Sequence, residues 1–168
     1  MQNLKDFLAT SVPPTFKDAR MTLEGALKST VLGEGLAQTS AYAVAVSLHS
    51  ERLAAALKEG MSADQTERAE VAAAIMGMTN VYYSFLDTVN DADITGLPAQ
   101  LRMVSYGQQA AKDKRAFEAA ALAVSIVGKC KPCIVSHVEE LRALGFTAEL
   151  FRDLARLAAA VNAVAKVV

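Results

Sequence analysis

The sequence predicts an all-helical protein that folds as a single domain over residues 1–168. Hydrophobic residues make up 52% of the chain, and alanine, leucine and valine supply most of them rather than aromatic residues. There is no tryptophan, and only nine glycines and four prolines, a composition typical of helices packed closely on small side chains. A chain of this length has room for one core but not for two comfortable ones.

The N-terminal half shows apolar residues at helical spacing, and no convincing alternation that would predict a strand. A short helix around residues 4–8 should stop at the proline pair that follows, and a second helix should cover residues 14–27. Gly33 and Gly35 should break the chain. One long alanine-rich helix should then extend to residue 58, where a glycine at position 60 ends it.

The C-terminal half continues the helical pattern. Residues 62–65, Ser-Ala-Asp-Gln, form a capping box that should open the next helix. Residues 90–98 are the expected loop. Three further helices should follow over residues 116–128, 130–144 and 147–168.

Two short segments of the chain resemble each other. Ala74–Gly77 and Ser125–Gly128 should each end an alanine-rich helix, and Glu67 and Glu118 lie at the same offset before them. Chance similarity between alanine-rich helices is the alternative, but we predict a true internal two-fold repeat. Its approximate halves are residues 35–95 and 98–168. Only the second half would carry catalytic residues, because the first has Thr79, Tyr82 and Leu86 in the places of Cys130, Cys133 and His137.

Charge and hydropathy indicate which partners and which cellular compartment to expect. Seventeen basic and eighteen acidic residues leave a net charge of −1, which favours neither a nucleic acid nor a membrane as partner. Charged residues interrupt every apolar stretch near the N-terminus, and the longest uncharged apolar run, 119–128, is about half of a bilayer span. We expect a soluble cytoplasmic protein. Thiols are kept reduced there, so two cysteines three positions apart indicate redox catalysis or metal binding.

Cys130, Cys133 and His137 should share one helical face, within an arc of about 60°. Pro132 between the cysteines fits a helix start, which places Cys130 near the start and Cys133 in the first turn. Free N–H groups, the helix dipole and flanking lysines would stabilise a thiolate there. A disulfide across so short a loop would stabilise the fold by roughly 2 kcal/mol at most. A redox pair therefore explains the spacing better than a structural disulfide.

Glu118 and His137 are the candidates for proton transfer. Glu118 is the only charged residue between Arg115 and Lys129, and a carboxylate among apolar neighbours needs a partner if it is buried. The alternative is an acid in the first turn of a helix. His137 can serve as base or proton shuttle beside the cysteines, although nearby glutamates also fit a surface histidine. We interpret His49, in the alanine-rich helix, as structural.

Glu118, Cys130, Cys133 and His137 follow the spacing E-x11-C-x2-C-x3-H. This pattern resembles the active-site signature of the AhpD family of alkyl hydroperoxide reductase systems, within the wider carboxymuconolactone decarboxylase-like superfamily. The resemblance covers most of the chain, including residues 73–82. It departs at Pro132, where some members carry a second histidine, so that any proton relay must rest on His137.

The resemblance implies an all-helical fold with an internal repeat, a homotrimer, and reduction of alkyl hydroperoxides. It implies that no cofactor is tightly bound, and that electrons come from dihydrolipoamide on a lipoyl-bearing protein. It also implies that a partner peroxiredoxin is regenerated. Cys133 would become the sulfenic acid, and Cys130 would resolve it and form the mixed disulfide with the peroxiredoxin. Glu118 and His137 would form the proton relay.

Three other interpretations stay open. The same four side chains could hold zinc, although structural zinc sites usually draw ligand pairs from separate loops and this chain has no second cluster. A decarboxylase of the wider superfamily would not need the cysteine pair. A purely structural helical oligomer would leave the shared face of Cys130, Cys133 and His137 unexplained.

Overall fold

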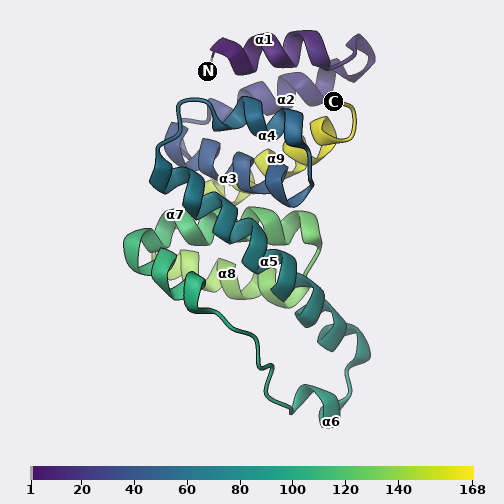
Figure 1. The fold of residues 1–168 in the computed structure, drawn as a ribbon, viewed down its shortest axis with the longest axis vertical. Helices are drawn as coiled ribbons and strands as arrows, with labels where there is room; N and C mark the ends of the chain where they lie inside the picture. The colour runs from purple at the N-terminus through teal and green to yellow at the C-terminus, as the bar shows by residue number, and fades with distance from the viewer. Residues whose placement is uncertain (1) are drawn as a thin grey trace.

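The computed structural model describes residues 2–168, and within that range the chain is helical, with no strand (Figure 1). This confirms the predicted all-α single domain. A 3₁₀ turn at Pro14–Phe16 precedes α2. The helices are α1 (Gln2–Ser11), α2 (Lys17–Leu27), α3 (Glu34–Ser47), α4 (Glu51–Lys58), α5 (Ala63–Val89), α6 (Ala92–Thr95), α7 (Val104–Gly128), α8 (Lys131–Ala143) and α9 (Ala148–Ala165).

The long helix predicted up to residue 58 is two helices, so that prediction was wrong. His49 adopts a left-handed backbone with φ of 56°, and α4 begins two residues later. An α-helix cannot continue through such a residue. His49 therefore lies in the turn between α3 and α4 and not in a helix. Gly33, with φ of 76°, does precede α3, whereas Gly35 lies in its first turn.

Helix α5 begins as predicted and ends later than predicted. The Ser62 hydroxyl accepts a hydrogen bond from the Gln65 backbone, and the Gln65 side chain accepts one from the Ser62 N–H. The helix passes through Gly77 without interruption and stops at Asn90, which is left-handed. The expectation that Gly77 ends a helix was therefore wrong. The expected loop after α5 contains the short helix α6, which the Asp91 carboxylate caps.

Helix α7 consists of two helical segments, of which the sequence predicted only the second. At Asp113 the backbone is extended, with φ of −158° and ψ of 88°. The Asp113 carboxylate then accepts a hydrogen bond from the Ala116 N–H at 3.0 Å and so opens the second segment. Helices α8 and α9 match their predicted ranges to within three residues at each end.

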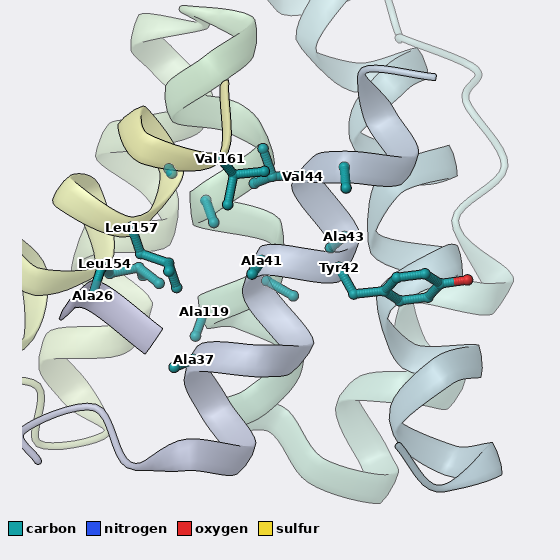
Figure 2. Packing of buried hydrophobic residues seen from close by; sticks show 14 of the residues in the cluster. Ala26, Ala37, Ala41, Tyr42, Ala43, Val44, Ala119, Leu154, Leu157 and Val161 are labelled. Atoms are coloured by element: carbon teal, nitrogen blue, oxygen red, sulfur yellow. The ribbon is translucent and has the colours of Figure 1, made fainter. Parts of the chain in front are cut away.

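Helices α3 and α7 form the centre of the bundle. Residues 37–45 and 117–125 are buried on every side, and helix α7 packs against α3, α5, α8 and α9. Alanine makes this possible, because small side chains let several helices approach closely. Figure 2 shows Ala37 and Ala41 of α3 near Leu154 and Leu157 of α9, with Ala119 of α7 beside them.

The second half of α5 projects from the bundle. It carries α6 at its far end, and the chain then returns to α7, while both termini lie at the opposite end of the molecule (Figure 1). Val81 and Phe85 on this part of α5 are exposed. Across the described chain, no helix combines the length and apolar character that crossing a membrane requires.

Candidate active site

The two cysteines lie at the start of α8, as predicted. Cys130 is the residue before the helix, and its Sγ accepts a hydrogen bond from the Cys133 N–H at 3.4 Å. Pro132 occupies the first turn, where no backbone N–H donor is required. Cys130 and Cys133 are joined in a disulfide, with their Cα atoms 5.3 Å apart.

The turn before α8 depends on close packing between α5 and α7. Lys129 ends α7 in the left-handed conformation, with φ of 55°. The preceding Gly128 lies against Asn80 of α5, and a Cβ on Gly128 would come within 2.5 Å of the Asn80 Nδ2. The Asn80 Oδ1 accepts a hydrogen bond from the Ser125 hydroxyl at 2.9 Å. This contact fixes the end of α7 and hence the start of α8.

Glu118 is the buried acid of the site, with none of its surface exposed. Its Oε2 lies 2.7 Å from the His137 Nδ1, and its Oε1 accepts a hydrogen bond from the Tyr106 hydroxyl. Burial alone would raise the pKa of Glu118, but the hydrogen bonds with His137 and Tyr106 outweigh it and hold that pKa below its usual value. Glu118 is therefore a carboxylate with both oxygens hydrogen-bonded.

The imidazole of His137 bridges Glu118 and α5. Because Nδ1 faces a carboxylate, it carries a hydrogen and donates it. The other nitrogen, Nε2, lies 3.1 Å from the Met76 Sδ. The Met76 sulfur has no hydrogen to donate, so this contact becomes a hydrogen bond only when Nε2 is protonated. Within the described residues the ring nitrogens contact Glu118 and Met76, and neither partner is a cysteine. The Cys133 Sγ lies 3.8 Å from the Thr79 carbonyl oxygen, which the reduced thiol could use as an acceptor.

A cavity of about 310 Å³ opens onto this group of side chains. Cys133 and His137 line it, whereas Cys130 is fully buried and Cys133 keeps 7% of its surface exposed. Cys133 is therefore the cysteine that a small molecule in the cavity would meet. The rest of the lining is mainly apolar and aromatic and comes from α5, α7, α8 and the segment before α7: Met76, Thr79, Tyr83, Met103, Tyr106, Pro132 and Ser136.

The structure brings all four candidate residues together, although they come from two helices.

In the first half of the predicted repeat, Glu67 is the counterpart of Glu118. Glu67 is exposed and pairs with Lys112 at 2.8 Å, so it is not a second buried acid. Among residues 2–168, no three His, Cys, Asp or Glu side chains are arranged to hold a metal ion.

Sequence reasoning missed Met76, Thr79 and Tyr106. Met76 and Thr79 reach the site only because α5 packs against α8. Nothing in their spacing indicates that contact.

Comparison with known proteins places the chain in a family. The family model described as "Carboxymuconolactone decarboxylase family" matches residues 92–168. A protein named alkyl hydroperoxide reductase AhpD from Hyphomonas neptunium is 35% identical over 164 residues, which cover 95% of this chain and 91% of that protein. The chain belongs to the AhpD family.

Two other relatives with the same name also match nearly the whole chain. The Maricaulis maris protein is 36% identical over 96% of this chain and 95% of its own length. The Rhizorhabdus wittichii protein is 33% identical over 98% of this chain and 96% of its own. The match to AhpD proteins therefore extends well beyond residues 92–168, and it confirms the resemblance seen in the four-residue signature.

Proposed function

We propose that this AhpD-family protein is a thiol peroxidase that reduces alkyl hydroperoxides with its cysteine pair and regenerates a partner peroxiredoxin with electrons from dihydrolipoamide. One observation carries the proposal: the Cys130–Cys133 disulfide at the start of α8 has Cys133 on a cavity beside the Glu118–His137 pair. The relatives' name, alkyl hydroperoxide reductase AhpD, supports the reduction of alkyl hydroperoxides.

In the oxidative half of the cycle, reduced Cys133 reacts first. Its thiol proton passes toward His137, and the thiolate attacks the terminal oxygen of the hydroperoxide. The O–O bond breaks, Cys133 becomes a sulfenic acid, and the leaving alkoxide takes the proton back as an alcohol. The Cys130 thiolate then attacks the Cys133 sulfur and expels water once a proton is supplied. The product is the disulfide present in this structure.

In the reductive half, a dihydrolipoyl dithiol returns two electrons. One of its thiolates attacks the disulfide, a mixed disulfide forms, and the second thiol displaces the enzyme. The donor leaves as cyclic lipoyl disulfide, and Cys130 and Cys133 become thiols again. The donor is a second substrate here, so no tightly bound cofactor is needed.

Regeneration of the peroxiredoxin uses the reduced pair. The Cys130 thiolate attacks the disulfide of the peroxiredoxin, and Cys133 then resolves the mixed disulfide. Cys130 is fully buried in the oxidised state, so this step requires the turn between α7 and α8 to open. We also propose that the protein forms a homotrimer and works in the cytoplasm.

The test uses the reduced protein and one equivalent of tert-butyl hydroperoxide, followed by mass measurement and thiol counting. We expect two thiols to be lost and one disulfide to form. Cys133→Ser should abolish peroxide turnover. Cys130→Ser should stop after one event and leave a sulfenic acid on Cys133 that dimedone labels and that slowly over-oxidises.

Several outcomes would contradict the proposal. Dimedone labelling of Cys130 would reverse the roles of the two cysteines. Stoichiometric zinc that cannot be removed without unfolding would favour the metal site. If both cysteines of the wild-type protein stay reduced after exposure to the hydroperoxide, the two remaining interpretations are a decarboxylase and a purely structural oligomer.

A further inference from the structure

Tyr106 reaches the buried carboxylate of Glu118 from a distant position on the same helix. The two residues are twelve positions apart and both lie within α7. In a straight α-helix that separation corresponds to about 18 Å along the axis, too far for the two side chains to touch. Their hydrogen bond therefore requires a break in the helix between them.

The break at Asp113 meets that requirement. Its extended backbone separates the two segments of α7, so the first segment can turn back toward the site. The Tyr106 ring packs edge to face on Phe117, with ring centres 5.1 Å apart. Phe117 is fully buried, so it holds the Tyr106 ring next to Glu118. Tyr106 also lines the cavity shared by Cys133 and His137.

We propose that Tyr106 is the positioning residue of the proton relay: its hydroxyl holds the Glu118 carboxylate charged and aimed at the His137 Nδ1. Among the hydrogen bonds of residues 2–168, that of the Tyr106 side chain goes to Glu118 and none joins it to a cysteine, so Tyr106 acts through Glu118. The inference rests on the proposed peroxidase function, because it concerns the relay used there. It extends the relay from two residues to three.

Without the hydroxyl, the Oε1 of Glu118 would lose its hydrogen bond in a fully buried place. The groups that lower the pKa of Glu118 are His137 on α8 and Tyr106 and Lys114 on α7. Lys114 is also paired with Glu140 of α8 at 2.6 Å. Helix α5 brings Met76, Thr79 and Tyr83 to this site. Met76 and Thr79 have no titratable group, so Tyr83 is the titratable side chain that α5 contributes to the cavity lining.

The direction of the pH effect follows from these contacts. Burial and the bond to Glu118 raise the pKa of the Tyr106 hydroxyl, so it stays protonated and donates. Tyr106→Phe removes a hydrogen bond to a charged group, and this loss raises the pKa of Glu118. As the pH is lowered, Tyr106→Phe should therefore lose turnover at a higher pH than the wild-type protein does. Above that range Glu118 is ionised again, and the rate should recover.

The experiment compares the pH dependence of peroxide turnover in Tyr106→Phe and Tyr42→Phe. Tyr42 is the matched control, because its buried ring also carries a hydroxyl that donates to a glutamate, Glu70, at 2.8 Å. Figure 2 shows Tyr42 on α3, and Tyr42 is not among the residues that line the cavity. We expect the acidic limb to move up by about one unit in Tyr106→Phe, with turnover about tenfold lower on that limb. Tyr42→Phe should keep the wild-type limb.

A second readout does not depend on activity. Titration of ¹³C-labelled glutamate by NMR, with Glu118→Gln to assign the signal, should show the Glu118 pKa raised in Tyr106→Phe. A fluorinated tyrosine at position 106 keeps the shape and donates more strongly, so it should lower that pKa. If the variants show these pKa shifts but the wild-type protein does not reduce peroxide, the peroxidase function is refuted and the role of Tyr106 toward Glu118 stands. Superimposable titrations in wild type and Tyr106→Phe, or an equal shift in Tyr42→Phe, would overturn the role of Tyr106.

Discussion

Glu118 and His137 are two ends of one hydrogen bond, and their separate effects on catalysis should reflect that. The carboxylate of Glu118 is fully buried, and its Oε2 lies 2.7 Å from the His137 Nδ1. A carboxylate in this position fixes the imidazole tautomer and stabilises the imidazolium that forms when the ring accepts a proton. It can do neither without the ring.

The prediction is that Glu118→Gln and His137→Gln each reduce peroxide turnover by roughly 10²–10⁴-fold, the usual range for general acid–base catalysis. Because both residues serve one step, the double variant should be little worse than the worse single variant. Steady-state rates with tert-butyl hydroperoxide measure all three. Losses that multiply would show that Glu118 acts independently, most simply as a structural acid near a helix start.

The residues that sequence reasoning found and missed differ in one respect. Cys130, Cys133 and His137 lie within two turns of one helix, so their common face follows from helical geometry alone. Glu118 was found through its apolar neighbours and the family signature. Tyr106 was missed because its approach to Glu118 requires the break at Asp113, and that break has no clear local signal.

At the scale of whole helices, starts were predicted better than interruptions. The Ser62 capping box and the Thr147 cap each satisfy N–H groups of their own first turn, so a few neighbouring residues determine them. The left-handed turn at His49 and the break at Asp113 depend on how α3, α4 and α7 pack. Neither position carries the glycine or proline that marks a break in sequence.

The two glycines of the predicted repeat have different surroundings. Gly77 lies inside α5, where a Cβ would meet no packing neighbour within 4 Å among the described residues, whereas a Cβ on Gly128 would overlap the Asn80 side chain. Gly128 is thus required by packing between α5 and α7. The predicted duplication with halves 35–95 and 98–168 stays a prediction, but its two glycines no longer share a role.

We therefore expect Gly128→Ala to displace Asn80 and break its hydrogen bond with Ser125. The cost should be about 1–3 kcal/mol, which lowers the melting temperature by several degrees in a chain of this size. Gly25→Ala is the control, because Gly25 is also helical and the new methyl group would meet no packing neighbour within 4 Å in the described chain. It should leave the melting temperature unchanged or slightly raised. Equal effects of the two substitutions would contradict the packing argument.

For the whole molecule, the projecting part of α5 presents an apolar face. Val81 is 72% and Phe85 49% exposed, and they lie one helical turn apart, so they share a face. Both border a hollow of about 590 Å³ that is also lined by Leu48, Val124 and Val127. Exposed apolar residues gathered beside a hollow are typical of an interface between protein chains.

The last prediction is that the protein is a homotrimer and that this face of α5 lies in the contact between subunits. Light scattering at micromolar concentration should give three chains per particle. Phe85→Glu and Val81→Glu should each yield smaller particles, because a buried unpaired carboxylate is costly. Met21→Glu is the matched control: Met21 is a similarly exposed hydrophobic residue, 53% exposed, on α2, and this variant should stay trimeric. A monomeric wild type would refute the trimer, and a trimer that survives both α5 substitutions would place the contact elsewhere on the surface.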